Sequence, residues 1–124
     1  MNALSSHFLR AATIYALIGM ALGIYMAASH DHSQAPTHAH LILLGWVSMA
    51  LYGLFYRSHD VRVATKLITA HKWLAHIGLV GMIAALFGMF SGYMMLEPVA
   101  AASSLVAFAA MALFALIVFR ETKA

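Results

Sequence analysis

Four apolar stretches separated by short polar breaks decide what this chain can fold into. Each stretch is close to the ~20 residues that an α-helix needs to cross the hydrocarbon core of a bilayer. Of the 124 residues, 64% are hydrophobic and only 9% are charged. The sequence therefore predicts an all-α integral membrane four-helix bundle in a single domain, residues 1–124, with antiparallel neighbours in an up-down order. We place the helices at residues 8–29, 37–57, 66–93 and 98–119.

A cleaved signal peptide is the alternative for the first stretch. Its apolar part is long for a signal peptide, and no small-residue cleavage site stands out before the first break. We therefore count it as a helix. Gly19 and Gly23 within it have the small-xxx-small spacing that lets two helices approach closely, and Gly88 and Gly92 repeat that spacing.

The basic residues predict the orientation of these helices. Lys and Arg side chains lie near both termini and at the second break, namely Arg10, Arg57, Arg62, Lys66, Arg120 and Lys123. The first and third breaks (29–36 and 92–98) have none. Because cytoplasmic loops are enriched in Lys and Arg, both termini and the 58–65 loop are expected in the cytoplasm. The protein is thus expected in the inner (cytoplasmic) membrane, with residues 30–40 facing the periplasm. The net charge of +3 is too small and dispersed to predict nucleic-acid binding.

Two histidines, His38 and His40, lie at the N-terminal end of the second predicted helix. Ionisable residues are rare inside membranes and often mark functional sites. Residues two apart on a helix point about 200° from each other, so both imidazoles cannot easily reach one iron, but each can serve a separate site. The alternative is that both are interfacial residues reaching headgroups or water. The chain has no cysteine, which excludes thiolate metal sites.

Two further histidines, His71 and His76, lie on the third helix and are secondary ligand candidates. A buried imidazole needs a hydrogen-bond partner, and Tyr52 and Tyr56 on the second helix, or a neighbour, are candidates for His76. No role is predicted for His71. His7 and His59, near the basic residues, are predicted to be solvated.

The first polar break offers a different site. His30 and His32 flank Asp31 there, and imidazole nitrogen is a good ligand for copper or zinc. A copper- or zinc-handling membrane protein is therefore an alternative function, and an accessory subunit without a cofactor is another. The candidate ligands of the copper site are His30, His32, His38 and His40, with Met26, Met94 and Met95 as soft ligands for Cu(I).

Residues 37–93 carry two runs typical of one protein family. The first contains His38-Ala39-His40, Leu44-Gly45-Trp46-Val47, Gly53 and Tyr56, and the second contains His71-Lys72-Trp73-Leu74-Ala75 and Ile77-Gly78-Leu79-Val80. The runs resemble the tenth and eleventh helices of the catalytic subunit of haem–copper oxygen reductases, the cbb-type branch above all. Nitric oxide reductases belong to the same superfamily.

The resemblance implies a haem b protein acting in electron transfer or in ligation of O₂ or NO. His38 matches the axial ligand of the high-spin haem and His40 an axial ligand of the low-spin haem, while Gly45 and Trp46 match packing positions near the porphyrins. The family has three four-helix arcs and this chain has one, so a homotrimer would restore the arrangement. The family's copper ligands and cross-linked tyrosine have no match here, and full oxygen reduction is not implied. The expected partners are the bilayer, two further copies, and an electron donor or respiratory complex.

Overall fold

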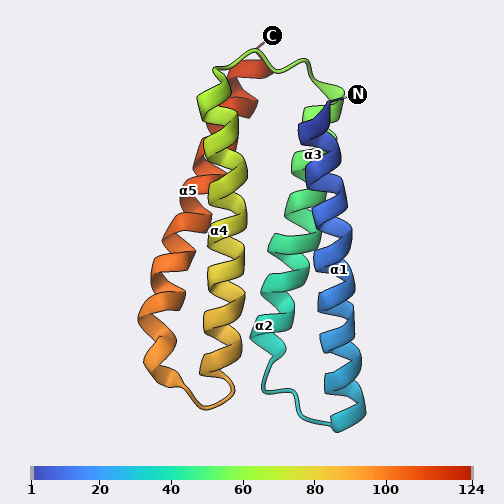
Figure 1. The fold of residues 1–124 in the computed structure, drawn as a ribbon, viewed down its shortest axis with the longest axis vertical. Helices are drawn as coiled ribbons and strands as arrows, with labels where there is room; N and C mark the ends of the chain where they lie inside the picture. The colour runs from blue at the N-terminus through green and yellow to red at the C-terminus, as the bar shows by residue number, and fades with distance from the viewer. Residues whose placement is uncertain (1, 124) are drawn as a thin grey trace.

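The computed structural model describes residues 2–123, and they form four helical spans (Figure 1). Each span is long and apolar enough to cross a membrane, so the chain has the length and composition of a four-span membrane protein. The elements are α1 (Ala3–Ser29), α2 (Ala35–His40), a π-helical segment η1 (Leu41–Val47), α3 (Ser48–Ser58), α4 (Thr65–Met89), a short 3₁₀ turn η2 (Met94–Leu96) and α5 (Glu97–Glu121). The second span is the continuous run of α2, η1 and α3, residues 35–58.

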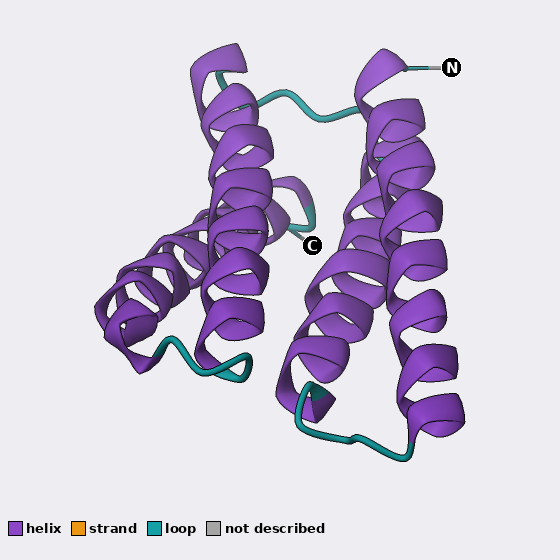
Figure 2. Cartoon of the chain, turned by 60° about the horizontal axis from the view of Figure 1, so that its bottom comes forward, coloured by secondary structure: helices purple, strands orange, loops and turns teal. Residues whose placement is uncertain are grey.

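The spans form two antiparallel hairpins that lie side by side. The first hairpin pairs α1 with the second span, and the second pairs α4 with α5 (Figures 1 and 2). Both termini lie at the same end as the 59–64 loop, which we call the terminal end, and the other two loops lie at the opposite end (Figure 1). The predicted up-down order of four helices is confirmed.

Two helix boundaries differ from the prediction by more than two residues. The first helix begins at Ala3 rather than at residue 8, because the side chain of Asn2 accepts a hydrogen bond from Ser5 N and caps the helix. Arg10 therefore lies two turns inside α1 and not at its start. The third helix ends at Met89 rather than at residue 93, where the chain turns through Gly92 with φ of +110°.

The π-helical segment is a feature that the sequence pattern did not predict. The backbone N–H and the hydroxyl of Ser48 both donate to the carbonyl of Leu43, five residues earlier, which closes the wide turn. Such turns occur mostly as single insertions within α-helices and often at functional sites. Gly45 lies in this segment and packs on α1, since a Cβ placed on Gly45 would lie 2.7 Å from the Cβ of Tyr15.

Small residues allow the close approach within each hairpin. A Cβ on Gly78 would lie 2.7 Å from the backbone nitrogen of Ala107, so the backbones of α4 and α5 lie close together at this position. Gly19 and Gly23 of α1 lie against the side chains of Ile42 and His38, as their spacing predicts.

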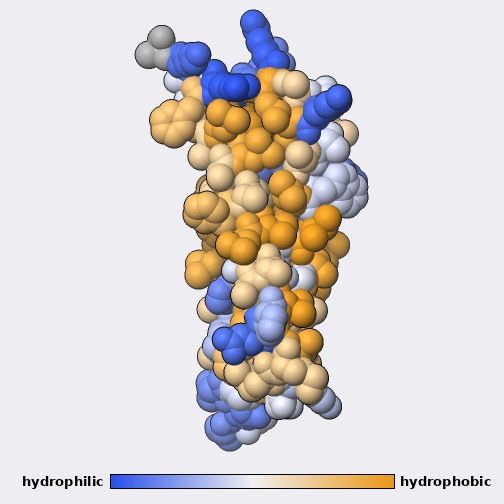
Figure 3. Space-filling view, turned by 90° about the vertical axis from the view of Figure 1, so that its left-hand side faces the viewer, coloured by the Kyte–Doolittle hydropathy of each residue, from blue (hydrophilic) through white to orange (hydrophobic). Residues whose placement is uncertain are grey.

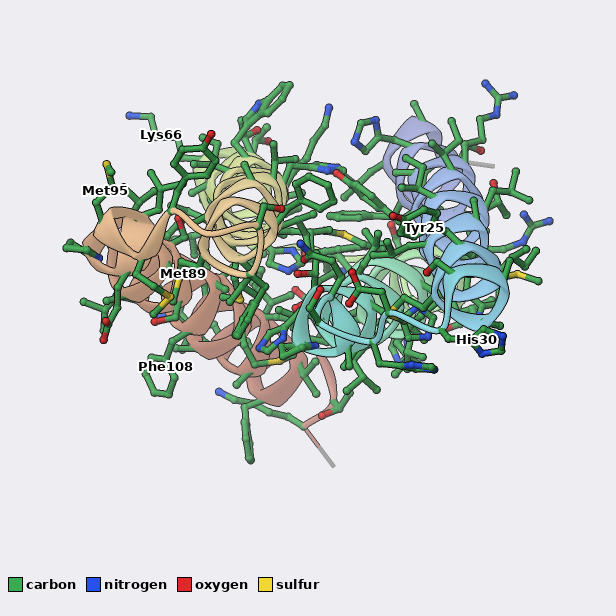
Figure 4. The ribbon with its side chains drawn as sticks, turned by 90° about the horizontal axis from the view of Figure 1, so that it is seen from below. Tyr25, His30, Lys66, Met89, Met95 and Phe108 are labelled. Carbon is green, nitrogen blue, oxygen red and sulfur yellow. The ribbon has the colours of Figure 1, made fainter. Side chains whose placement is uncertain are left out.

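Apolar side chains cover the outer faces of the spans. Figure 3 shows a hydrophobic band over the α4 and α5 side of the molecule, between hydrophilic ends. Phe108, 73% exposed, and Met95 point away from the other helices (Figure 4). Such a surface suits contact with lipid tails or with other membrane helices.

Candidate functional site

His38 lies at the junction of α2 and α1. Its Nδ1 donates to the carbonyl of Gly19, 2.8 Å away. The ring lies over Gly23, where an added Cβ would be 3.0 Å from the His38 Cε1. The absence of a side chain on Gly23 thus makes room for the imidazole.

His40 lies on the other side of the same helix. Its Nδ1 donates to the carbonyl of Pro36, 2.7 Å away and one turn earlier. The side chain lines a groove of about 440 Å³ between the second span and the second hairpin. The other lining residues are Ala39, Leu43, Leu44, Met82, Ser104, Ala107, Phe108 and Met111, so the groove wall is almost entirely apolar.

These two hydrogen bonds fix the tautomer of both rings. A backbone carbonyl can only accept, so in each neutral imidazole the proton is on Nδ1 and the lone pair is on Nε2. A metal-binding histidine usually has this arrangement, in which the hydrogen bond of one ring nitrogen orients the other toward the metal. His38 faces α1 and His40 faces α4 and α5, so the structure places them on opposite faces of the second span.

Gly45 and Trp46 have different surroundings. Gly45 is buried against Tyr15 and Leu79, at the contact between the two hairpins. Trp46 is 40% exposed on the outer surface of the second span.

His76 joins the two hairpins through both of its ring nitrogens. Its Nδ1 lies 2.7 Å from the hydroxyl of Tyr15, and its Nε2 lies 2.8 Å from the Nε2 of His7. The expectation that Tyr52 or Tyr56 serves His76 is wrong, and so is the expectation that His7 is only solvated. Both actual partners lie on α1, whose rotation relative to α4 no local sequence pattern specifies.

His71 is completely buried among aromatic rings. Its Nδ1 lies 2.9 Å from the hydroxyl of Tyr56. Its Nε2 has no hydrogen-bond partner among residues 2–123. The rings of Tyr52 and Phe114 lie 4.4 and 5.1 Å from the imidazole, centroid to centroid. Tyr56 is thus the polar contact that holds this side chain.

The loop residues do not gather into one site. Figure 4 places His30 and Met95 on opposite sides of the molecule. Within residues 2–123, no three His, Asp or Glu side chains come together in a group that could hold a metal ion. His38 and His40 are held apart in the same way, each with its own surroundings.

Comparison with known proteins found no match: no family model, no curated protein and no solved structure matches this chain. The resemblance to haem–copper oxygen reductases therefore stays a prediction.

Proposed function

We propose that this chain is a haem b-binding membrane protein that acts in electron transfer or in the ligation of O₂ or NO. The observation that carries the proposal is the state of His40, whose Nδ1 is held by a carbonyl and whose Nε2 carries a free lone pair beside an apolar groove. Neutral imidazole is a common axial ligand of haem iron.

The groove suits a flat apolar group. Its volume of about 440 Å³ falls in the range of roughly 300–1,000 Å³ that is usual for small-molecule sites. Its walls come from three spans, and Ser104 is the one hydroxyl residue among those that line it. A haem bound there would supply a one-electron iron couple. The chain itself would supply the imidazole of His40, its orientation by Pro36 O, and a largely apolar wall.

A second axial ligand would come from another copy of the chain. His38 cannot share the iron held by His40, because its ring faces α1 on the opposite side of the second span. We therefore propose a homotrimer, in which the haem held by His40 in the groove of one copy also takes a histidine from an adjacent copy. Closed cyclic symmetry of this kind is common in homo-oligomers. An electron donor or a respiratory complex is the further partner that this function needs.

The visible spectrum of the purified protein tests the haem proposal. We expect b-type bands on reduction, with haem content measured as the pyridine haemochrome. His40→Ala and His38→Ala should each lose haem, whereas His30→Ala, in the exposed loop, should keep it. A colourless protein after haem supplementation, or full haem content in both variants, contradicts the proposal. The mass of the detergent-solubilised complex tests the trimer separately.

We also propose that the terminal end faces the cytoplasm, so that His38 and His40 lie near the periplasmic surface of the inner membrane. The basic residues around the 59–64 loop and the C-terminus support this orientation. The chain has no native cysteine, so single cysteines can report accessibility. In intact cells, a membrane-impermeant maleimide should label Ser33→Cys and leave Ser58→Cys unlabelled. The reverse pattern contradicts the proposed orientation.

A further inference from the structure

We infer that His7, His76 and Tyr15 form a proton-transfer chain through the part of the bundle near the terminal end. The three side chains are joined by two hydrogen bonds, 2.8 Å from His7 Nε2 to His76 Nε2 and 2.7 Å from His76 Nδ1 to the Tyr15 hydroxyl. This inference is independent of the haem proposal, since it uses neither His38 nor His40.

The middle member has the chemistry that such a chain requires. An imidazole can accept a proton on one ring nitrogen and release a different proton from the other, so it passes a proton on without moving. His76 has both nitrogens in hydrogen bonds, one to each neighbour. Phe8 stacks on its ring at 6.0 Å and an interplanar angle of 8°, which holds the ring in place.

The two ends of the chain lie in different environments. His7 lines an open hollow of about 620 Å³ along the first three turns of α1, where the polar side chains of Asn2, Ser6 and Arg10 alternate with Ala3, Ala11 and Ile14. Tyr15 lines a separate groove of about 570 Å³ between the two hairpins. The other residues of that groove are Ile18, Leu22, Thr37, Leu41, Leu79, Val80, Ile83, Ala84 and Phe87. The chain therefore connects an open hollow that carries polar groups with an apolar groove.

The charges around the chain favour a mobile proton over a bound metal cation. Lys72, whose ammonium lies 4.9 Å from the Trp73 ring centroid, adds positive charge near both His7 and His76. Arg10 adds another on the α1 side. Within residues 2–123, no carboxylate forms a hydrogen bond with the three side chains, and His71 is bonded to Tyr56 instead. Two adjacent imidazolium ions would repel each other, so the pair holds one extra proton at most.

A proton that moves inward passes along these two hydrogen bonds from His7 to Tyr15. Water gives a proton to Nδ1 of His7, and the Nε2 proton of His7 passes to Nε2 of His76. The Nδ1 proton of His76 passes to the Tyr15 oxygen, and the original hydroxyl proton of Tyr15 passes to a water molecule that enters the groove and serves as the acceptor. One proton enters and one leaves, and the net charge of the three side chains is unchanged. The opposite tautomers carry a proton outward by the same bonds.

The exchange of the His76 ring proton with water tests this inference. It can be measured by NMR in detergent micelles on protein labelled with ¹⁵N-histidine. In His7→Phe we expect exchange to slow by about a hundredfold, the lower end of what a positioned acid–base side chain contributes. His59→Phe, at the same end of the molecule, is the matched control and should exchange at the wild-type rate.

If the His7→Phe variant fails to fold, a second measurement on the wild-type protein tests the same inference. In the wild-type protein, a scalar coupling between the two Nε2 nuclei should report the bond between His7 and His76 directly. Tyr15→Phe should shift the Nδ1 resonance of His76 and leave its exchange through Nε2 within about twofold of the wild-type rate. Wild-type exchange in a folded His7→Phe, or the absence of the nitrogen–nitrogen coupling, overturns the inference.

Discussion

The hydroxyl of Tyr56 and the Nδ1 of His71 lie 2.9 Å apart and join the second span to α4 inside the bundle. Similar polar bridges join the two hairpins elsewhere. Tyr15 reaches His76, and Gln34 donates to the carbonyl of Phe87, 3.0 Å away, near the far end. The two hairpins are therefore joined by specific hydrogen bonds as well as by apolar contact.

Removing the hydroxyl of Tyr56 should weaken this contact between the hairpins. Tyr56→Phe keeps the aromatic ring but leaves His71, which is completely buried, without its hydrogen bond. We expect the free energy of unfolding to fall by about 1–2 kcal/mol, since a buried unpaired polar group is costly and hydrogen bonds between membrane helices are of modest strength. Titration of the detergent-solubilised protein with sodium dodecyl sulfate measures this. Tyr25→Phe, at an exposed position, is the control, and equal stability of the two variants contradicts the prediction.

Adding one methyl group at Gly78 should separate α4 from α5. The new Cβ would lie 2.7 Å from the backbone nitrogen of Ala107 and 2.9 Å from its Cα, and backbone cannot move aside as a flexible side chain can. Overpacking of this kind costs about 1–3 kcal/mol, more than the roughly 1 kcal/mol that alanine gains over glycine in helix propensity. We therefore expect Gly78→Ala to lower the free energy of unfolding. Gly92→Ala, which adds a Cβ with no atom within 4 Å at φ of +110°, should strain the 90–93 loop only. Distances between spin labels on α4 and α5 should increase in the Gly78 variant alone.

A methyl group at Gly45 should act at a distance, on His76. The Cβ would meet Tyr15 at its Cβ and Cγ, 2.7 and 3.0 Å away, and so push the Tyr15 hydroxyl off the Nδ1 of His76. In Gly45→Ala we expect the Nδ1 resonance of His76 to move toward its position in Tyr15→Phe. An unchanged Nδ1 resonance in a folded Gly45→Ala would show that Tyr15 does not depend on this contact.

The 30–34 loop should change with pH through Asp31. Hydrogen bonds from the backbone N–H of Ser33, 3.0 Å from the carboxylate, and from the Ser33 side chain hold the pKa of Asp31 below its ordinary value of 3.8. A lowered pKa means that the ionised form stabilises the loop at pH values above 3.8, and that this stabilisation is lost as the pH falls through the lower pKa of the folded state. The amide proton shift of Ser33 should titrate with a midpoint below 3.8. The matched variant Asp31→Asn should show no such titration, and a midpoint above 3.8 in the wild-type protein contradicts the prediction.

The helices could be predicted from the sequence because their cause is local. A run of about 20 apolar residues has few alternatives to a membrane-spanning helix, and Pro98 lies in the first turn of α5 as a helix start favours. The separation of His38 and His40 onto two faces is equally local, since it follows from the helical repeat within one turn. The helix ends at Ala3 and Met89 depended on a cap and a turn that hydropathy does not detect.

The partners of the buried histidines could not be predicted in the same way. The contact of His76 with His7 and Tyr15 depends on how α1 and α4 are rotated about their axes, which is set by packing across the two hairpins. The π-helical segment was not predicted either, and within it Gly45 packs against Tyr15 of α1, a contact between helices that hydropathy does not specify. One signal was available in the sequence: His7 and Tyr15 are separated by about two helical turns, and helical side chains lean toward the N-terminus, so both can reach a single partner on a neighbouring helix.

The wide turn at Leu41–Val47 divides the second span into two parts with independent angular positions. A regular α-helix advances about 100° per residue. The extra residue in each π-helical turn therefore changes the angular position of His38 and His40 about the helix axis relative to that of Tyr52 and Tyr56. Deleting a single residue between 41 and 47 would turn one half of the helix by about that angle with respect to the other. The π-helical segment therefore sets the angle between the half of the span that carries His38 and His40 and the half that carries Tyr52 and Tyr56.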